Sequence, residues 1–218
     1  MQNDPQDGAA PPRRARGRPR AFDRAAALTA AMQLFWRKGY EASSIADLTE
    51  AMGVGPTSLY AAFGSKDALY AEAMKAYAGR YAHLTQGGFR AAPTACEAVR
   101  AYLRDSATAM TGADCDLPRG CMVNLGMVGS EGHEALAAEM RDARGAAFDM
   151  LRARLAEAVA SGELPPRLDV AAVARFIQTV QSGMAIRARD GATRGELEAV
   201  AALALAGWDA MIAAATPA

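Results

Sequence analysis

Residues 43–66 constrain the fold of this chain more than any other stretch. Ser44 and Asp47 have the spacing of a capping box, and apolar residues then recur at helical intervals. Gly53 suits the left-handed position that follows a helix, and Pro56 suits the first turn of the next helix. The stretch therefore predicts two short helices joined by a tight turn that contains glycine.

The second of these helices has one apolar face and one face of small or polar groups. Leu59 and Phe63 are four residues apart and face the core, which leaves Thr57, Ser58 and Ala61 pointing outward. A helix-turn-helix has this form, and its second helix must fit a major groove about 12 Å wide. Ordinary helical hairpins share the pattern, so on its own it leaves DNA binding and simple packing about equally open.

The sequence around this motif resembles the N-terminal DNA-binding domain of the TetR family of one-component transcriptional regulators. The resemblance extends over about 55 residues without a gap, which is far more specific than a lone motif. The matching positions are Ala31, Leu34, Phe35, Gly39, Tyr40, Ser44, Ile45, Asp47, Leu48, Gly53, Val54, Leu59, Tyr60, Phe63, Lys66 and Leu69.

Helical periodicity and this resemblance predict an all-α chain in three parts. These are a flexible basic arm at 1–20, a DNA-binding domain at 21–81 with its helix-turn-helix at 44–63, and a C-terminal effector-binding and dimerisation domain at 82–218. Beyond the motif, glycines are expected to break the helical pattern near 86–88. Helices are expected near 23–38, 66–84, 94–111, 121–128, 132–160, 169–189 and 194–214.

The resemblance also implies which residues contact DNA. Pro56, Thr57, Ser58 and Tyr60 would meet bases and backbone, while Lys66 and the arginines of the arm would meet phosphate. The alternatives are an exposed lysine without a role and a basic tail that is merely solvated. The full set of predicted DNA-binding residues is Arg18, Arg20, Ser44, Pro56, Thr57, Ser58, Tyr60 and Lys66.

Composition narrows the class of protein further. The formal net charge is zero, but arginines concentrate before and within the predicted DNA-binding domain. No run of 18 apolar residues and no secretory signal is present, so a cytoplasmic protein without a membrane partner is expected. Because no nucleophile elbow, phosphate loop or dinucleotide fingerprint occurs, the chain is predicted not to be an enzyme and to need no cofactor.

The cysteines Cys96, Cys115 and Cys121 lack the spacing of a metal site, so no metal is predicted. Reduced, idle thiols are the simplest interpretation. The alternative is a redox or electrophile sensor at Cys121, because a predicted helix N-terminus and Arg119 would both lower a thiol pKa.

The resemblance implies a homodimer formed by the last two helices and regulation by a small molecule of unknown identity. The predicted function is a ligand-responsive repressor that binds a palindromic operator. Activation, and a helical dimer that binds nucleic acid without sequence preference, remain alternatives. Apolar character alone suggests an effector pocket formed by Met122, Phe148, Phe176 and Trp208.

Overall fold

The computed structural model describes residues 22–112, 117–126 and 131–216. All regular secondary structure in these ranges is helical, which confirms the predicted all-α class. The basic arm with Arg18 and Arg20, together with Cys115, lies outside the described residues. The helices are α1 (Arg24–Lys38), α2 (Ile45–Met52), α3 (Pro56–Phe63), α4 (Lys66–Tyr81), α5 (His83–Ala91), α6 (Ala95–Thr111), α7 (Glu134–Ala160), α8 (Val170–Arg189), α9 (Arg194–Ala206) and α10 (Trp208–Ala214).

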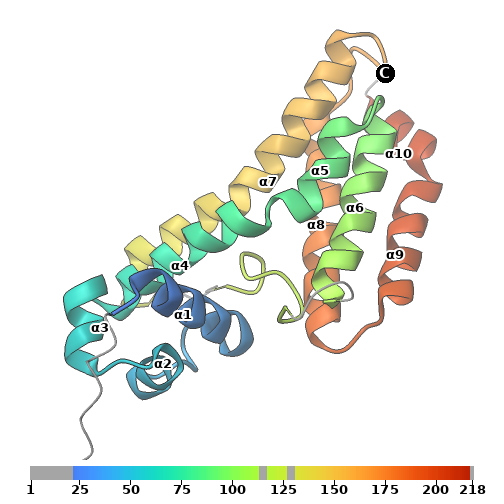
Figure 1. The fold of residues 1–218 in the computed structure, drawn as a ribbon. Helices are drawn as coiled ribbons and strands as arrows, with labels where there is room; N and C mark the ends of the chain where they lie inside the picture. The colour runs from blue at the N-terminus through green and yellow to red at the C-terminus, as the bar shows by residue number, and fades with distance from the viewer. Residues whose placement is uncertain (1–21, 113–116, 127–130, 217–218) are drawn as a thin grey trace, which may run out of the picture.

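The molecule is elongated, with a small helical head at one end (Figure 1). The head consists of α1, α2 and α3, and α4 leads from it toward the remaining helices. Its core holds the fully buried side chains of Leu48 and Leu59, together with Phe35 and Leu69 from α1 and α4. Burying each of these side chains stabilises the fold by about 1.5–3 kcal/mol. Because this stabilisation requires close packing, it favours one angle between the two helices of the motif.

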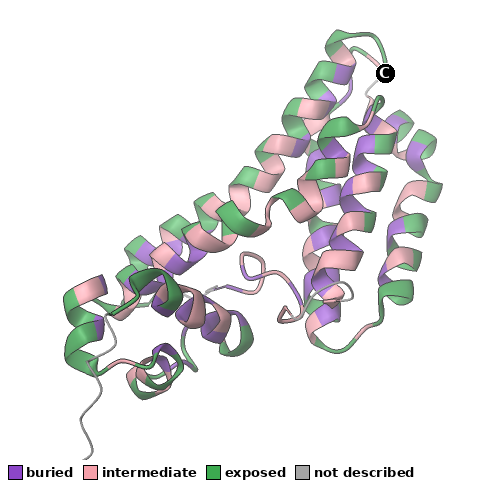
Figure 2. Ribbon diagram, in the orientation of Figure 1, coloured by how far each residue is buried: buried purple, intermediate pink, exposed green. Residues whose placement is uncertain are grey.

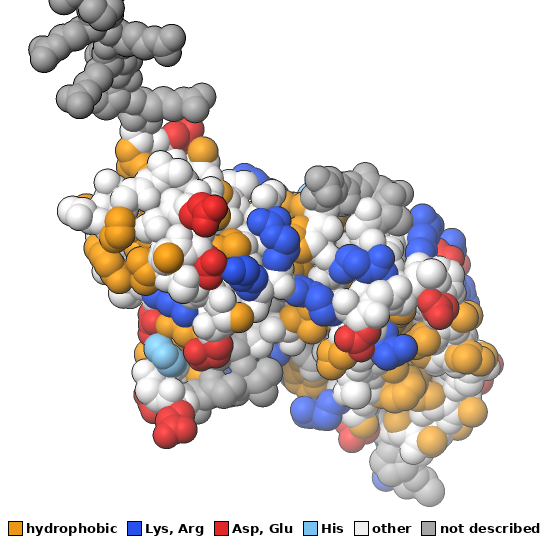
Figure 3. Space-filling view, turned by 90° about the horizontal axis from the view of Figure 1, so that it is seen from below, with side chains coloured by type: hydrophobic (Ala, Val, Ile, Leu, Met, Phe, Trp, Pro, Cys, Tyr) orange, Lys and Arg blue, Asp and Glu red, His pale blue; other side chains and the backbone are white. Residues whose placement is uncertain are grey.

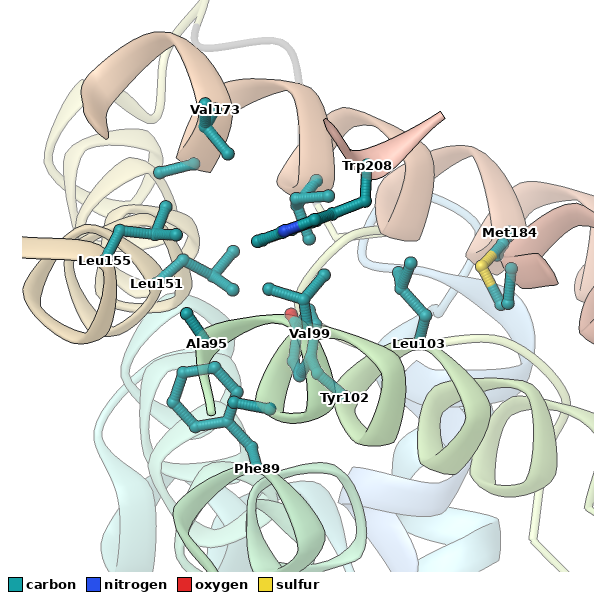
Figure 4. Packing of buried hydrophobic residues seen from close by; sticks show 14 of the residues in the cluster. Phe89, Ala95, Val99, Tyr102, Leu103, Leu151, Leu155, Val173, Met184 and Trp208 are labelled. Atoms are coloured by element: carbon teal, nitrogen blue, oxygen red, sulfur yellow. The ribbon is translucent and has the colours of Figure 1, made fainter. Parts of the chain in front are cut away.

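A second hydrophobic cluster holds the C-terminal helices together. Figure 4 shows Val99 and Leu103 of α6 facing Trp208 of α10, with Leu151 and Leu155 of α7 closing one side. Because α6 lies at the centre of this cluster, its apolar residues are almost all buried. The buried residues follow the inward faces of the helices throughout the chain (Figure 2).

Helix α7 belongs to both clusters. Near its start Leu136 and Met140 pack into the core of the head, whereas Leu151 and Leu155 pack into the C-terminal core. The boundary predicted at residue 81 stays a prediction, and the α7 contacts tie the head to the rest of the molecule across it.

Two expectations about the middle of the chain are wrong. The glycines near 86–88 do not interrupt a helix but lie inside α5, where a Cβ on Gly88 would come within 2.7 Å of Asp105 Oδ2 on α6. Glycine here therefore permits close helix packing. The described part of the helix predicted at 121–128 forms turns instead, because residues 117–126 cross between the head and α8.

In the described ranges, no single helix has the length and apolar character needed to cross a membrane. Among the helices that the structure describes, α9 and α10 taken together satisfy that length-and-composition test, but they are bent by 50° at Gly207.

Candidate nucleic-acid interface and ligand cavity

Helix α3 presents a bare face to solvent. Pro56, Thr57 and Ser58 are exposed, and Tyr60 keeps 47% of its surface accessible, whereas Leu59 on the opposite face is fully buried. Pro56 at the first position of α3 has no N–H that would be left unsatisfied there. The face predicted to enter the major groove is thus free of the protein's own core.

The helix before it is held by a full capping box. Ser44 Oγ accepts from the Asp47 N–H at 3.0 Å, and the Asp47 carboxylate accepts from the Ser44 N–H at 3.0 Å. Lys38 Nζ lies 2.8 Å from the same carboxylate, and this ammonium, followed by the Ser44 contacts, holds the pKa of Asp47 well below its usual range. Gly53 takes the predicted left-handed conformation with φ of 66°. The side chain of Ser44, a predicted DNA contact, therefore already has a structural role.

Lys66 begins α4 beside this motif. Its Nζ lies 4.1 Å from the centroid of the Tyr40 ring, a cation–π contact that positions the ammonium at the N-terminal end of the helix. A cation held at a helix N-terminus suits an anion such as a phosphate. The phosphate contact itself stays a prediction.

The guanidinium of Arg24 links α1, α3 and α4. Arg24 of α1 forms a bidentate pair with Glu72 of α4 at 2.5 and 2.7 Å and donates to the Ala62 carbonyl of α3 at 3.3 Å. The same group stacks over the Phe63 ring at 4.4 Å. These contacts hold α3 at a fixed position relative to α1 and α4.

A polar cluster joins the head to the start of α7. The Tyr40 hydroxyl donates to Asp67, and His133 Nδ1 lies 2.9 Å from the other oxygen of that carboxylate. The Tyr40 hydroxyl contact and then the His133 contact hold the pKa of Asp67 below its usual value. His133 is half-buried and connects the two parts of the molecule.

Arg119 and Arg189 connect the 117–126 segment to α8 and to the head. Arg119 donates from Nε to the Ala188 carbonyl at 2.8 Å and also contacts the Ala192 carbonyl. Arg189 donates to the carbonyls of Trp36, Arg37 and Arg119 at 2.5, 2.7 and 3.0 Å. The C-terminal end of α1 is therefore capped by a side chain of α8.

A cavity of about 160 Å³ lies where these segments meet. Trp36 of α1 and Tyr77 and Tyr81 of α4 form an aromatic wall, with ring centroids 4.8 to 5.4 Å apart. Helices α5, α6, α7 and α8, with residues 120–124, supply the remaining walls, which include Arg144 and the buried Gln181. Tyr77 and Tyr81 of α4 therefore lie beside residues of the C-terminal helices.

Cys121 lies in the wall of this cavity, where its sulfur accepts a hydrogen bond from the Tyr77 hydroxyl at 3.5 Å. The reasoning that selected it is wrong in two respects. No helix begins at this residue, and the nearby Arg119 guanidinium points to carbonyls of α8 and its exit. Cys121 as a thiol sensor stays a hypothesis, now based on its place in the cavity.

The four residues predicted to form the effector pocket do not line this cavity. Met122 is buried in the head cluster, Trp208 in the C-terminal core, and Phe176 is exposed on α8. Phe148 packs under the Arg175 guanidinium at 4.9 Å. Apolar character alone therefore did not identify the cavity wall, because the α7 face toward the cavity carries Ala143, Ala147 and Met150.

Sequence reasoning missed Trp36, Arg189 and His133. The periodicity of α1 pointed to Phe35 and left its neighbour Trp36 unexplained, although a tryptophan off the apolar stripe signals a second buried face. Nothing in the local sequence distinguishes Arg189 from its exposed neighbour Arg187.

Large hydrophobic side chains remain exposed on the C-terminal helices. Four of the six in the described residues belong to α8 and α9, and Leu203 keeps 76% of its surface accessible. Seen from below, hydrophobic side chains gather over this end of the molecule (Figure 3). Within the ranges the structure covers, no group of three His, Cys, Asp or Glu side chains is placed to hold a metal ion.

A capped helix-turn-helix whose second helix exposes one face to solvent is the arrangement found in DNA-binding regulators. Residues 27–73 match the family model for bacterial regulatory proteins of the tetR family. The transcriptional repressor ComR of Escherichia coli K12 is 36% identical over 92% of this chain and 95% of its own length. For the repressor BdcR of the same strain the identity is 33%, over 86% and 90%.

Among solved structures, a cysteine mutant of the TetR family regulator CifR bound to 26-bp double-stranded operator DNA aligns with a TM-score of 0.81. It is 40% identical and covers 88% of this chain and 100% of that one. The chain therefore belongs to the TetR family of transcriptional regulators. Membership of a family of regulators agrees with the prediction that it is not an enzyme.

Proposed function

We propose that this chain is a cytoplasmic repressor that binds a palindromic operator as a dimer and releases it when a small molecule enters the cavity. The observation that carries the proposal is the bare face of α3 above the buried Leu59. Repressors at 33–36% identity, and a relative at 40% identity in complex with operator DNA, support the same function.

On this proposal α3 lies in the major groove with Thr57, Ser58 and Tyr60 toward the bases, and Lys66 contacts phosphate. None of these side chains makes a strongly base-specific pair, so phosphate contacts supply much of the affinity. The two α3 helices of a dimer would lie about 34–36 Å apart, one turn of DNA.

The test is selection of a binding site from random double-stranded DNA, followed by measurement of variants. Tyr60→Ala should weaken binding to the selected site on the order of tenfold. Lys66→Ala should reduce the slope of log K against log salt by about 1. Arg152→Ala, an exposed cation far along α7, is the control and should change neither quantity. Unchanged binding by both head variants would refute the assigned face.

Dimerisation is proposed through α8 and α9, which expose four large hydrophobic side chains. Exposed hydrophobic residues that gather on one surface are typical of a protein–protein interface. Leu203→Glu should convert the dimer to a monomer in sedimentation without unfolding it, because the side chain packs against little in one protomer. Ala156→Glu on the exposed side of α7 is the control. A dimer that persists in Leu203→Glu would contradict this interface.

A thiol-based response is a second candidate, favoured by the position of Cys121 in the cavity wall. Iodoacetamide would form a carbon–sulfur bond, with iodide leaving and the thiol proton passing to solvent. Release of operator DNA after alkylation, and its loss in Cys121→Ser, would support this route. Equal release from Cys121→Ser would exclude it.

A helical dimer without sequence preference is the remaining alternative. Excess random DNA would then compete equally with the selected site, whereas the proposed repressor should retain its site.

A further inference from the structure

The side chain of His133 turns away from its own helix and contacts the head. His133 directly precedes α7, and among the described residues no hydrogen bond joins its side chain to the first turn of that helix. Its Nδ1 lies instead 2.9 Å from Asp67 Oδ2, in the first turn of α4. Polar residues at this position commonly cap the helix they precede, so the contact with α4 calls for another explanation.

The Asp67 carboxylate is contacted on both of its oxygens. The Tyr40 hydroxyl donates to Oδ1, and His133 Nδ1 faces Oδ2. The Tyr40 contact and then the His133 contact hold the pKa of Asp67 below its usual value, and an ionised carboxylate can only accept hydrogen bonds. We therefore assign a proton to His133 Nδ1, since a bare nitrogen there would repel the carboxylate.

The ring of Tyr40 carries this arrangement to Lys66. The rings of Tyr70 and His133 stand edge-on to it, each with its centroid 5.1 Å from that of Tyr40. The Lys66 ammonium lies 4.1 Å from the centroid of the same ring. Lysine side chains are mostly exposed, whereas Lys66 is half-buried. The ring therefore orders Lys66 before DNA arrives, which removes part of the entropy cost of binding.

The contact between His133 and Asp67 suits orientation better than stability. The two side chains keep 32% and 43% of their surface accessible. Ion pairs that water reaches contribute little to the free energy of unfolding. We therefore expect that His133 can be replaced without unfolding the protein, so that an effect on DNA binding can be measured separately.

Helix α7 connects this contact to the cavity. It is a single helix from Glu134 to Ala160, and Ala147 in its middle lines the cavity about 20 Å along the helix from His133. Helix α4 runs beside it and also lines the cavity, through Tyr77 and Tyr81 (Figure 1). The contact of His133 with Asp67 thus joins α7 to α4 at the end of both helices that lies in the head.

We propose that His133 is a positioning residue for DNA binding: through Asp67 and Tyr40 it holds Lys66 in the orientation that meets phosphate. Phosphate binding then depends on the position of α7 as well as on that of α4. This inference rests on the proposed function, since it names how the body of the molecule controls the head.

The test is a double-mutant cycle of His133→Ala and Lys66→Ala, with the affinity of the full-length protein for the selected site measured by fluorescence anisotropy. His133→Ala should weaken binding about two- to tenfold, as expected when one long side chain must be ordered on binding. In the Lys66→Ala background the same substitution should change affinity by less than about twofold, because the lysine it positions is gone. A purely structural role would weaken binding equally in both backgrounds.

Two further variants separate the bond from the side chain. His133→Asn keeps an N–H donor close to the place of Nδ1 and should bind within about twofold of the unsubstituted protein. His83→Ala, at the exposed first residue of α5, is the matched control and should leave affinity unchanged. Titration at DNA concentrations far above the dissociation constant gives the active fraction of each preparation, so that unfolded protein is not mistaken for weak binding.

The proposal is overturned if His133→Ala binds as well as the unsubstituted protein, if its effect is the same with and without Lys66, or if His133→Asn loses as much affinity as His133→Ala. Failure of the unsubstituted protein to prefer the selected site over random DNA would count against the proposed function. Specific binding with additive effects of the two substitutions would count against this inference alone.

Discussion

Replacing Arg189 with methionine removes the side chain of α8 that caps the end of α1. The unsubstituted guanidinium donates to three carbonyls, those of Trp36, Arg37 and Arg119, at 2.5 to 3.0 Å. A hydrogen bond that involves a charged group contributes about 1.5–3 kcal/mol, but water can reach part of this site and replace some of the loss. Burial also lowers the pKa of Arg189, so removing the charge relieves a desolvation cost. We therefore expect a net loss of about 2 kcal/mol in the free energy of unfolding.

Urea unfolding at one fixed protein concentration measures this loss, because unfolding of a dimer depends on concentration. Arg187→Met is the matched control: Arg187 lies two residues away on α8, is exposed, and forms an ion pair with Asp190 at 3.4 Å. A surface pair of this kind contributes about 0–1 kcal/mol. Equal effects of the two substitutions, or a loss below about 0.5 kcal/mol for Arg189→Met, would refute the role of the contact.

Three further predictions concern the N-terminal part of the chain. Ser44→Ala should lower the free energy of unfolding by about 1 kcal/mol through loss of the α2 cap, and an unchanged urea midpoint would contradict this. The Tyr40 hydroxyl and then His133 depress the pKa of Asp67, so its contribution is present above about pH 4 and is lost as pH falls through the folded-state pKa. Asp67→Asn should therefore flatten the fall in stability below about pH 4, and an equally steep fall there would exclude the contribution. Deleting residues 1–20 should weaken operator binding and reduce its salt slope, whereas an identical slope would mean that the arm makes no phosphate contact.

Local chemistry made the helix-turn-helix predictable. Ser44 and Asp47 cap α2 through contacts within three residues, and Gly53 ends it through its own backbone conformation. The exposed face of α3 followed from the spacing of Leu59 and Phe63 alone. These features do not depend on any distant part of the chain.

The cavity was not predictable in the same way. Its wall combines Trp36 with Tyr77, Cys121 and Gln181, which lie far apart in sequence and meet only after α1, α4 and α8 have packed. The turns at 121–126 also override a locally apolar pattern, because Arg119 and Arg189 bind this segment to α8 and α1. Tertiary contacts of this kind leave no periodic signal in the sequence.

The central claim is that the exposed face of α3 reads DNA, and hydroxyl-radical footprinting on a site selected from random double-stranded DNA tests it most directly. The account predicts two protected patches about one helical turn apart, and in Tyr60→Ala both should need about tenfold more protein while the dimer persists. Selection that yields no preferred site, or protection that is unchanged in Tyr60→Ala, would contradict it.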